Sequence, residues 1–373
     1  SPFETAMAVL TACVLSLARL PAFEVVDDSF TTGAHTVRLK VLRNRRTAER
    51  LEVAPALGGK TEALLLRTAT RHGCRLRPTL LDHHRNATAA RANAAWKGAM
   101  LVPFANRVKN GSYALAGERH FLERNEDRGP YGKNALHGYL YKHEMTVLHE
   151  AANDTSASLT LGYNFDGTDA GYPFLLSVNI TYTLHERRAG ACAASAFTAT
   201  TTATNTMAAA PLPFSTGWHS YFAVSDASRA VVALDGCTPW NHILLTNHSN
   251  RYGDLIPTGR TAPSAAFDGR APLGGTPQRP TYYDDEFKAT APPRACGRLS
   301  TRITDGNETA VLWQDDNFRF VQVYSGAKET FGEDAIAVEA MSSEADAWNN
   351  EEGVRILQAG ETFSGSFGVY LDP

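Results

Sequence analysis

The chain alternates apolar and polar residues in short runs that turn-forming residues separate. The clearest run covers residues 176–184, where apolar residues fill every second position and match the period of a β-strand. Shorter or threonine-rich runs predict further strands at 37–41, 159–161, 197–205, 309–314, 318–324 and 365–371. Sustained helical periodicity is hard to find after residue 22. Many short strands with polar turns predict an all-β protein, built as a large antiparallel β-sandwich or barrel.

Two stretches interrupt the strand pattern. Residues 82–97 are rich in Ala, Arg and His without a clear apolar stripe, which indicates a surface loop or a short helix. Residues 253–293 are dense in Gly and Pro, so long strands are not expected there, and loops of such length tend to border binding sites. We find no linker and no repeat, and therefore interpret residues 23–373 as one domain.

Residues 1–22 resemble a secretory leader. An apolar stretch from Met7 ends at Leu20, Pro21 and Ala22, as in a signal peptide with a small-residue exit, and it is too short to span a bilayer. We therefore expect no membrane insertion, and a secreted protein. No basic residue precedes the stretch, so a cytoplasmic protein with a buried N-terminal helix or a disordered leader remains the alternative.

Glycan acceptors and cysteines fit a secreted protein. The pattern Asn-X-Ser/Thr marks five candidate glycosylation sites, Asn86, Asn153, Asn179, Asn247 and Asn307. A sixth match, Asn110, lies inside a candidate site motif and is set apart for that reason. Removal of Cys13 with the leader leaves four cysteines that permit three disulfide pairings or four free thiols, namely Cys74, Cys192, Cys237 and Cys296.

The charge balance and the missing motifs exclude several classes of function. With 36 basic and 39 acidic residues, the chain has no positive excess for phosphate backbones, so nucleic acid is not an expected partner. It contains no GxSxG, P-loop or GxGxxG motif, which argues against serine hydrolases, NTPases and dinucleotide enzymes. The expected substrate is small or neutral.

Four polar clusters place ionisable or amide groups in apolar surroundings, at residues 103–113, 134–138, 215–222 and 337–350. In the last of these, Glu339 follows an apolar run, where loss of water raises the pKa of a carboxylate and increases its basicity. Each cluster also has a purely structural interpretation. His137, His219 and Glu339 would form a conceivable metal-ligand set, but they lack the local spacing of a zinc site, and no metal is expected.

In chain order, these clusters resemble the motifs of the aldose 1-epimerases, or galactose mutarotases. The series runs PFANRVKNGSYALAG, NALHG, GWHSYF, DDEF, FVQVYSG and AVEAMSSEADAWNN, and the resemblance spans about residues 34–371. It implies a galactose mutarotase-like supersandwich, an antiparallel β-sandwich that holds a sugar in a cleft on one sheet. Residues 42–100 match only diffusely, and Ala340 stands where the family usually has Pro.

The resemblance also implies roles for individual residues. Glu339 corresponds to the general base and His219 to the general acid. Five further residues correspond to sugar-binding positions, namely His137, Asn106, Arg107, Asp284 and Gln322. A one-residue shift would put Asp285 in the place of Asp284.

The implied activity is the interconversion of the α and β anomers of free hexoses such as glucose or galactose. It needs proton transfers alone, so we expect no cofactor, and a small sugar as the only partner. Two alternatives share the scaffold. A hexose-6-phosphate mutarotase would need added basic residues around the cleft, and a non-catalytic carbohydrate-binding protein would not need the acid and base.

Overall fold

The computed structural model describes residues 20–70, 73–189, 192–235, 238–248, 253–264, 267–292 and 297–372. Most of these residues lie in antiparallel strands, which confirms the all-β class predicted from the alternation. The predicted leader at 1–22 falls almost wholly outside the described residues. Its last residue, Ala22, is buried, and its carbonyl oxygen accepts a bond from Arg45. No helix within the described ranges has the length and hydropathy needed to cross a membrane.

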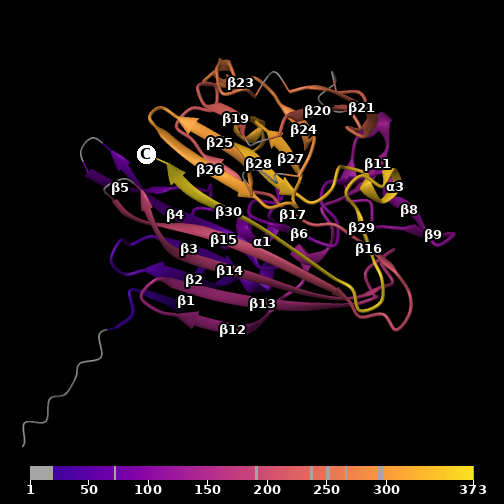
Figure 1. Cartoon of the computed structure of the whole chain (residues 1–373), viewed down its shortest axis with the longest axis horizontal. Coiled ribbons are helices and arrows are strands. Elements are labelled where there is room, and N and C mark those ends of the chain that lie inside the picture. Colours follow the sequence, from indigo (N-terminus) through magenta and orange to yellow (C-terminus); the bar gives the residue numbers. More distant parts are fainter. Residues whose placement is uncertain are drawn as a thin grey trace, which may run out of the picture.

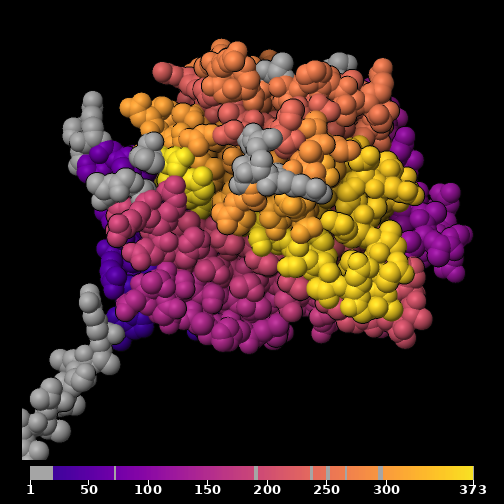
Figure 2. Space-filling view, in the orientation of Figure 1, coloured from indigo at the N-terminus to yellow at the C-terminus, as the bar shows by residue number. Residues whose placement is uncertain are grey.

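An eight-stranded sheet contains the strongest alternating run (Figure 1). In spatial order its strands are β12 (Thr146–Ala152), β13 (Ser156–Asp166), β14 (Leu175–Ala189), β15 (Cys192–Asn205), β30 (Thr362–Asp372), β26 (Glu308–Gln314), β25 (Leu299–Asp305) and β19 (Val231–Asp235). The C-terminal β30 pairs with β15 and β26, so segments far apart in sequence lie side by side. In Figure 2 the yellow C-terminal residues meet the magenta ones at the surface.

A second sheet carries the motifs of the candidate site. Its strands in order are β21 (Pro257–Pro263), β20 (Trp240–Leu245), β24 (Asp284–Ala289), β27 (Phe320–Tyr324), β28 (Ala335–Met341), β17 (Gly217–Trp218) and β6 (Met100–Leu101), and β18 (Tyr221–Ala223) also pairs with β28. Apolar side chains of both large sheets, such as Ile180 of β14 and Val338 of β28, belong to one buried cluster. Burial of this area is the main stabilising contribution to the fold.

The N-terminal strands form a five-stranded sheet of β1 (Phe23–Thr32), β2 (His35–Asn44), β3 (Arg50–Ala54), β4 (Lys60–Thr70) and β5 (Gly73–Pro78). A disulfide between Cys74 and Cys192, with Cα atoms 5.8 Å apart, joins β5 to β15. It identifies one pair among the cysteines whose pairing the sequence left open. The other candidates, Cys237 and Cys296, lie outside the described residues, as does Cys13.

Short pairings and helices connect the sheets. The pairings are β11 (Lys133–Leu136) between β10 (Glu126–Asp127) and β7 (Arg107–Val108), β8 (Ser112–Leu115) with β9 (Glu118–Phe121), β16 (Leu212–Phe214) with β29 (Arg355–Leu357), and β22 (Gly275–Thr276) with β23 (Arg279–Pro280). The α-helices are α1 (Ala87–Ala92), α2 (Ala327–Phe331) and α3 (Ala347–Asn350).

The predicted elements can be compared with these bounds. Every strand predicted from alternation lies in or overlaps an observed strand, and α1 is the short helix allowed for residues 82–97. The loop-rich region 253–293 contains more structure than its composition indicates, because β21 and β24 are strands of seven and six residues. Pairing with β20, which lies between them, fixes both strands despite the neighbouring Gly and Pro.

Candidate active site

The short pairing of β7 with β11 brings two of the sequence motifs together. Arg107 pairs with Leu136, and the backbone N–H of His137 donates to the carbonyl oxygen of Asn106 at 3.0 Å. Asn106 and His137 both have left-handed backbone, with φ of 56° and 65°. Asn tolerates this conformation better than most residues do. The Asn-Arg and Leu-His-Gly motifs therefore meet at one wall of a cavity.

Arg107 is held in a buried network of charges. Its Nε lies 3.0 Å from Glu126 Oε2, and its Nη2 lies 2.9 Å from Glu126 Oε1 and 3.9 Å from Asp284 Oδ2. Arg128 also binds Glu126, with 2.7 Å between Nη2 and Oε1. Burial by itself lowers the pKa of Arg107, but the two carboxylates outweigh it and raise that pKa. Arg107 thus stays charged and fixed in place.

Two amides extend this network toward the sheet. Gln322 Nε2 donates to Asp284 Oδ1 at 2.6 Å, and Gln322 Oε1 accepts a bond from Asn106 Nδ2 at 3.2 Å. Gln322 lies directly opposite Glu339 in the pairing of β27 with β28. Since neighbouring strands place paired side chains on the same face, Gln322 and Glu339 lie next to each other.

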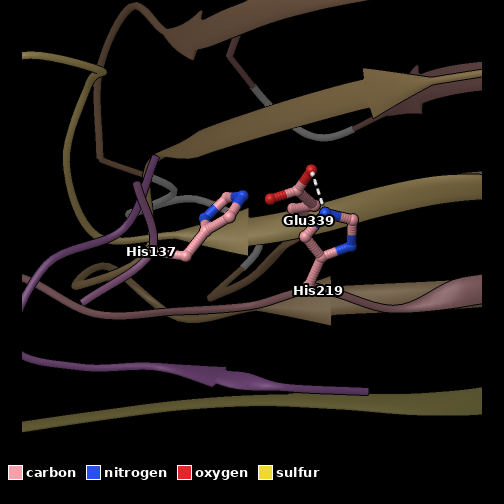
Figure 3. A group of neighbouring side chains, drawn as sticks. All are labelled: His137, His219 and Glu339. Carbon is pink, nitrogen blue, oxygen red and sulfur yellow. Dashed lines mark ion pairs between the residues drawn. The ribbon is translucent and has the colours of Figure 1, made fainter. Parts of the chain in front are cut away.

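His219 lies between β17 and β18 and faces Glu339 (Figure 3). Its backbone N–H donates to Ala99, and its carbonyl oxygen accepts from Gly98. The ring stacks on Tyr221 with centroids 5.0 Å apart. His219 Nε2 is 3.4 Å from Glu339 Oε1, the dashed line in Figure 3, and the side chains of His137, His219 and Glu339 gather around one space.

Burial shifts the pKa values of these three groups toward their neutral forms. It raises the pKa of Glu339 well above its usual value, helped by the Asp284 carboxylate and opposed by Arg107. It lowers the pKa of His219 to about 3, and that of His137 well below its usual value. Within this buried pair, the proton that the carboxylate and the imidazole share is therefore favoured on Glu339.

Each of the three side chains has a buried polar atom to spare. His137 Nδ1, His219 Nδ1 and Glu339 Oε2 are among the buried side-chain atoms of the described residues that have no hydrogen-bond partner. Such atoms are rare in folded proteins and need an explanation. All three residues line a cavity of 190 Å³, so a polar molecule in the cavity would have unused donors and acceptors to meet.

The cavity collects all seven residues that the sequence assigned to the site, from six motifs that are far apart along the chain. It also has lining residues that the sequence analysis did not assign, notably Trp96, Glu126, Arg128, Tyr282, Tyr324 and Thr330. Tyr221 lies in the GWHSYF motif but had no role. Nothing in the sequence except its charge marks Glu126 as part of the site. It lies next to Arg107 only because β10 pairs with β11 and β11 pairs with β7.

The structure separates the two neighbouring aspartates. Asp284 lies in the cavity, where Tyr282 Oη also donates to its Oδ2 at 3.3 Å. Asp285 points to other partners, with its Oδ1 2.8 Å from His242 Nε2 and 3.1 Å from His248 Nε2. Successive residues of a strand face opposite sides of the sheet. Asp284 is therefore the aspartate placed to contact a ligand.

His137, His219 and Glu339 also have ligand atoms within 4.8 Å of one another. Within the described ranges they are the one group of three His, Cys, Asp or Glu residues found with this closeness. Two imidazoles and a carboxylate suit zinc. A metal ion would occupy the same lone pairs that proton transfer requires, so metal binding and acid–base chemistry exclude each other here.

These features define a class of site, in which a buried carboxylate and imidazole face a small polar cavity on an antiparallel sandwich. The model of the family described as aldose 1-epimerase matches residues 68–370. The chain belongs to this aldose 1-epimerase family.

The chain is also similar to individual proteins. The chain is 25% identical over 278 residues to the uncharacterized protein YihR of Escherichia coli K12, which covers 73% of this chain and 78% of YihR. Its fold is similar to that of a galactose mutarotase-like protein from Clostridium acetobutylicum, with a TM-score of 0.69, 16% identity and coverage of 94% and 99% of the two chains. Its fold is also similar to that of galactose 1-epimerase from Lactobacillus acidophilus, with a TM-score of 0.68, 15% identity and coverage of 94% of this chain and 99% of that chain. These structures confirm the predicted galactose mutarotase-like sandwich.

Proposed function

We propose that the protein interconverts the α and β anomers of free hexoses such as glucose or galactose by acid–base ring opening. The observation that carries this proposal is the buried pair of Glu339 and His219, 3.4 Å apart beside unpaired polar atoms in the cavity. A cyclic hexose is a hemiacetal, and its ring opens when the C1 hydroxyl loses a proton while the ring oxygen gains one. A pair that shares one proton can perform both transfers.

In this reaction Glu339 acts as the base and His219 as the acid. Glu339 takes the C1 hydroxyl proton, the C1–ring oxygen bond breaks, and the ring oxygen receives the proton of His219. The aldehyde then rotates about the C1–C2 bond, and closure with reversed proton transfers gives the other anomer. Burial favours the proton on Glu339, but a hydrogen bond donated by the C1 hydroxyl stabilises the carboxylate, and a ring oxygen that accepts a hydrogen bond stabilises the imidazolium.

The polar wall would hold the other hydroxyls during the rotation. Asp284 and Gln322 are bonded to each other, Asp284 also lies near Arg107, and Gln322 accepts a bond from Asn106, so their remaining lone pairs and N–H groups have set directions. His137 lies with its ring centroid 5.1 Å from that of His219, where it can bind the sugar near the ring oxygen. Positioning of this kind keeps the open-chain intermediate in the cavity until the ring recloses.

The charges of the cavity favour a free sugar over a phosphorylated one. Its lining cations are Arg107 and Arg128, and both are bound to Glu126 and lie within 4.0 Å of Asp284. A phosphate would have to compete with these carboxylates for either guanidinium. The hexose-6-phosphate alternative is therefore less well supported by the described residues.

Polarimetry tests the proposal directly. Freshly dissolved α-glucose and α-galactose should reach their equilibrium rotation faster with the protein than with the Glu339→Gln variant, which serves as a matched blank. The 6-phosphates of the same sugars should show little acceleration. Acceleration of the phosphates alone would support the phosphate alternative, and acceleration of neither would leave a non-catalytic sugar-binding protein.

We also propose that the protein is secreted. The Cys74–Cys192 disulfide is of a kind that persists in oxidising compartments. Among the candidate glycan sites, Asn86, Asn153, Asn247 and Asn307 are exposed, whereas Asn179 is half-buried. The amide of Asn247 also donates a hydrogen bond to Asp254. A mass decrease on endoglycosidase treatment would support secretion. An unglycosylated protein with its N-terminal stretch retained would contradict it.

A further inference from the structure

The segment 82–97 matches the family pattern only diffusely, yet it forms part of the cavity wall. Ala94, Ala95 and Trp96 line the cavity, directly after α1. Asn86 caps the start of α1 by accepting the N–H of Ala89, and Asn93 ends the helix in left-handed backbone. We call residues 82–97 the wall segment.

Charged side chains, some buried and some exposed, attach the wall segment to the N-terminal sheet. Lys60 of β4 donates to the carbonyl oxygen of Ala90 at 3.2 Å. Arg85 lies 2.6 Å from Asp28 Oδ2 and 3.3 Å from Glu52 Oε2. These contacts hold α1 against β1, β3 and β4.

Glu333, just after α2, attaches the other side of the segment. Its Oε1 is 3.0 Å from Lys97 Nζ, and its Oε2 is 2.6 Å from His84 Nε2. The Lys97 ammonium also lies 4.2 Å from the centroid of the Phe331 ring. Because Thr330 of α2 lines the same cavity, these contacts join two sides of its wall. The wall segment is therefore a fixed surface.

Trp96 is the large side chain that this surface presents to the cavity. It is half-buried, and its ring lies edge to face with His137 at 5.0 Å and with Tyr141 at 6.5 Å between centroids. Its backbone is left-handed, with φ of 52°, which is an uncommon conformation for a bulky residue. Backbone strain of this sort persists where surrounding contacts impose it, often at ligand sites.

We propose that Trp96 is a sugar-binding residue, whose indole packs on a C–H face of the hexose ring beside His137. A pyranose presents polarised C–H groups on the faces of its ring, and the π face of an indole carries partial negative charge that attracts them. Asp284 and Gln322 hydrogen-bond the hydroxyls of the sugar, whereas Trp96 packs on the C–H groups of its ring. This inference rests on the proposed function for the identity of the ligand.

Steady-state kinetics of Trp96→Ala and Trp96→Phe test this role. We expect Trp96→Ala to raise KM for galactose and glucose about tenfold with little change in kcat, and Trp96→Phe to restore most of the KM. The pH dependence of the rate should be unchanged in both, because neither variant alters the acid or the base. An unchanged KM in Trp96→Ala, or a loss confined to kcat, would overturn the inference.

Tryptophan fluorescence gives a test that needs no turnover. Galactose titrated into Glu339→Gln should change the emission, and the change should be absent in Glu339→Gln/Trp96→Phe. The other four of the five tryptophans are buried, and none of them lines the cavity. A change that persists in the double variant would overturn the inference. A Trp96-dependent change in a protein without mutarotase activity would instead leave sugar binding intact and contradict the proposed reaction.

Discussion

Among the residues that the structure describes, two buried pairs of a histidine and a glutamate occur, and one of them lines the cavity of the candidate site. His83 Nδ1 is 3.0 Å from Glu62 Oε1, and His219 Nε2 is 3.4 Å from Glu339 Oε1. All four residues are buried. The residue types, burial and separation are alike, so these properties alone do not distinguish a structural pair from a catalytic one.

The pairs differ in the charge that accompanies the carboxylate. Lys60 Nζ lies 2.7 Å from Glu62 Oε2. Burial by itself raises the pKa of Glu62, but the bond from His83 and the charge of Lys60 outweigh it and lower that pKa. Glu339 faces the like charge of Asp284, while Arg107 is bound mainly to Glu126.

The comparison teaches that the placement of counter-charges decides what a buried pair can do. A carboxylate with a dedicated ammonium is stabilised as an anion and gains nothing by accepting a proton. A carboxylate whose nearest cation is already engaged remains a strong base, and that is a cost in stability that a catalytic site carries. Substitutions at the two pairs, and at a third cluster of histidine and carboxylate, test this contrast.

The largest expected effect is that of Glu339→Gln on the rate of mutarotation. The amide keeps the shape but removes the basicity, so we expect a loss of about a hundredfold to ten-thousandfold in polarimetry. His219→Asn should cause a loss of similar size. A near-wild-type rate in Glu339→Gln would contradict the assigned base.

The same variant should be more stable than the wild type at pH 7. The folded-state pKa of Glu339 is raised, so the stability that its protonated form contributes is present below the unfolded pKa and is lost as the pH rises through the folded pKa. Glutamine does not titrate and avoids this loss. Thermal melts at pH 7 and at about pH 4 would show the gain only at the higher pH.

Glu62→Gln should have the opposite effects to Glu339→Gln, with a loss of stability and no loss of activity. It leaves the buried Lys60 without its counter-ion, so we expect a loss of about 3 kcal/mol in the free energy of unfolding, with kcat unchanged. Denaturant unfolding and polarimetry measure the two quantities. Replacement of both Lys60 and Glu62 by Met is the matched control and should recover much of the stability. A large loss of kcat in Glu62→Gln, under conditions where the variant is still folded, would remove the contrast between the pairs.

The pH dependence of the rate should be bell-shaped, since the active form of the Glu339–His219 pair carries one proton. Addition of a second proton at low pH and loss of the first at high pH both inactivate the pair, and the two limbs belong to the pair as a whole. Lys60 and Glu62 lie outside this unit, so Lys60→Met/Glu62→Met should keep the bell. A flat profile from about pH 4 to 9 would argue against a proton shared by this pair.

The sequence predicted much of the fold and seven residues of the site, for separate physical reasons. Strict alternation at 176–184 is possible because β14 has one face in the core, and the structure confirms the strand. The order of the motifs predicted that His137, His219 and Glu339 share one site, and all three line the cavity. The prediction was possible because each residue is positioned by a turn or strand register within its own motif. Trp96 and Glu126 were missed, since their roles depend on contacts made only in the tertiary fold. The separation of Asp284 from Asp285 likewise needed the register of β24.

The smallest effect is expected at a third cluster of histidine and carboxylate, where His242 and His248 bind Asp285 and are partly exposed. Burial by itself raises the pKa of Asp285, but bonds from both histidines lower it to about 2, and the bond to Asp285 raises the pKa of His248. The aspartate contributes stability above its unfolded pKa, and the histidine contributes below its own. The cluster is therefore most stabilising between about pH 4 and 6.5. Asp285→Asn should lower the melting temperature most in this window and less at pH about 9, with mutarotation intact. A loss of activity equal to that of Asp284→Asn would show instead that both aspartates serve the cavity.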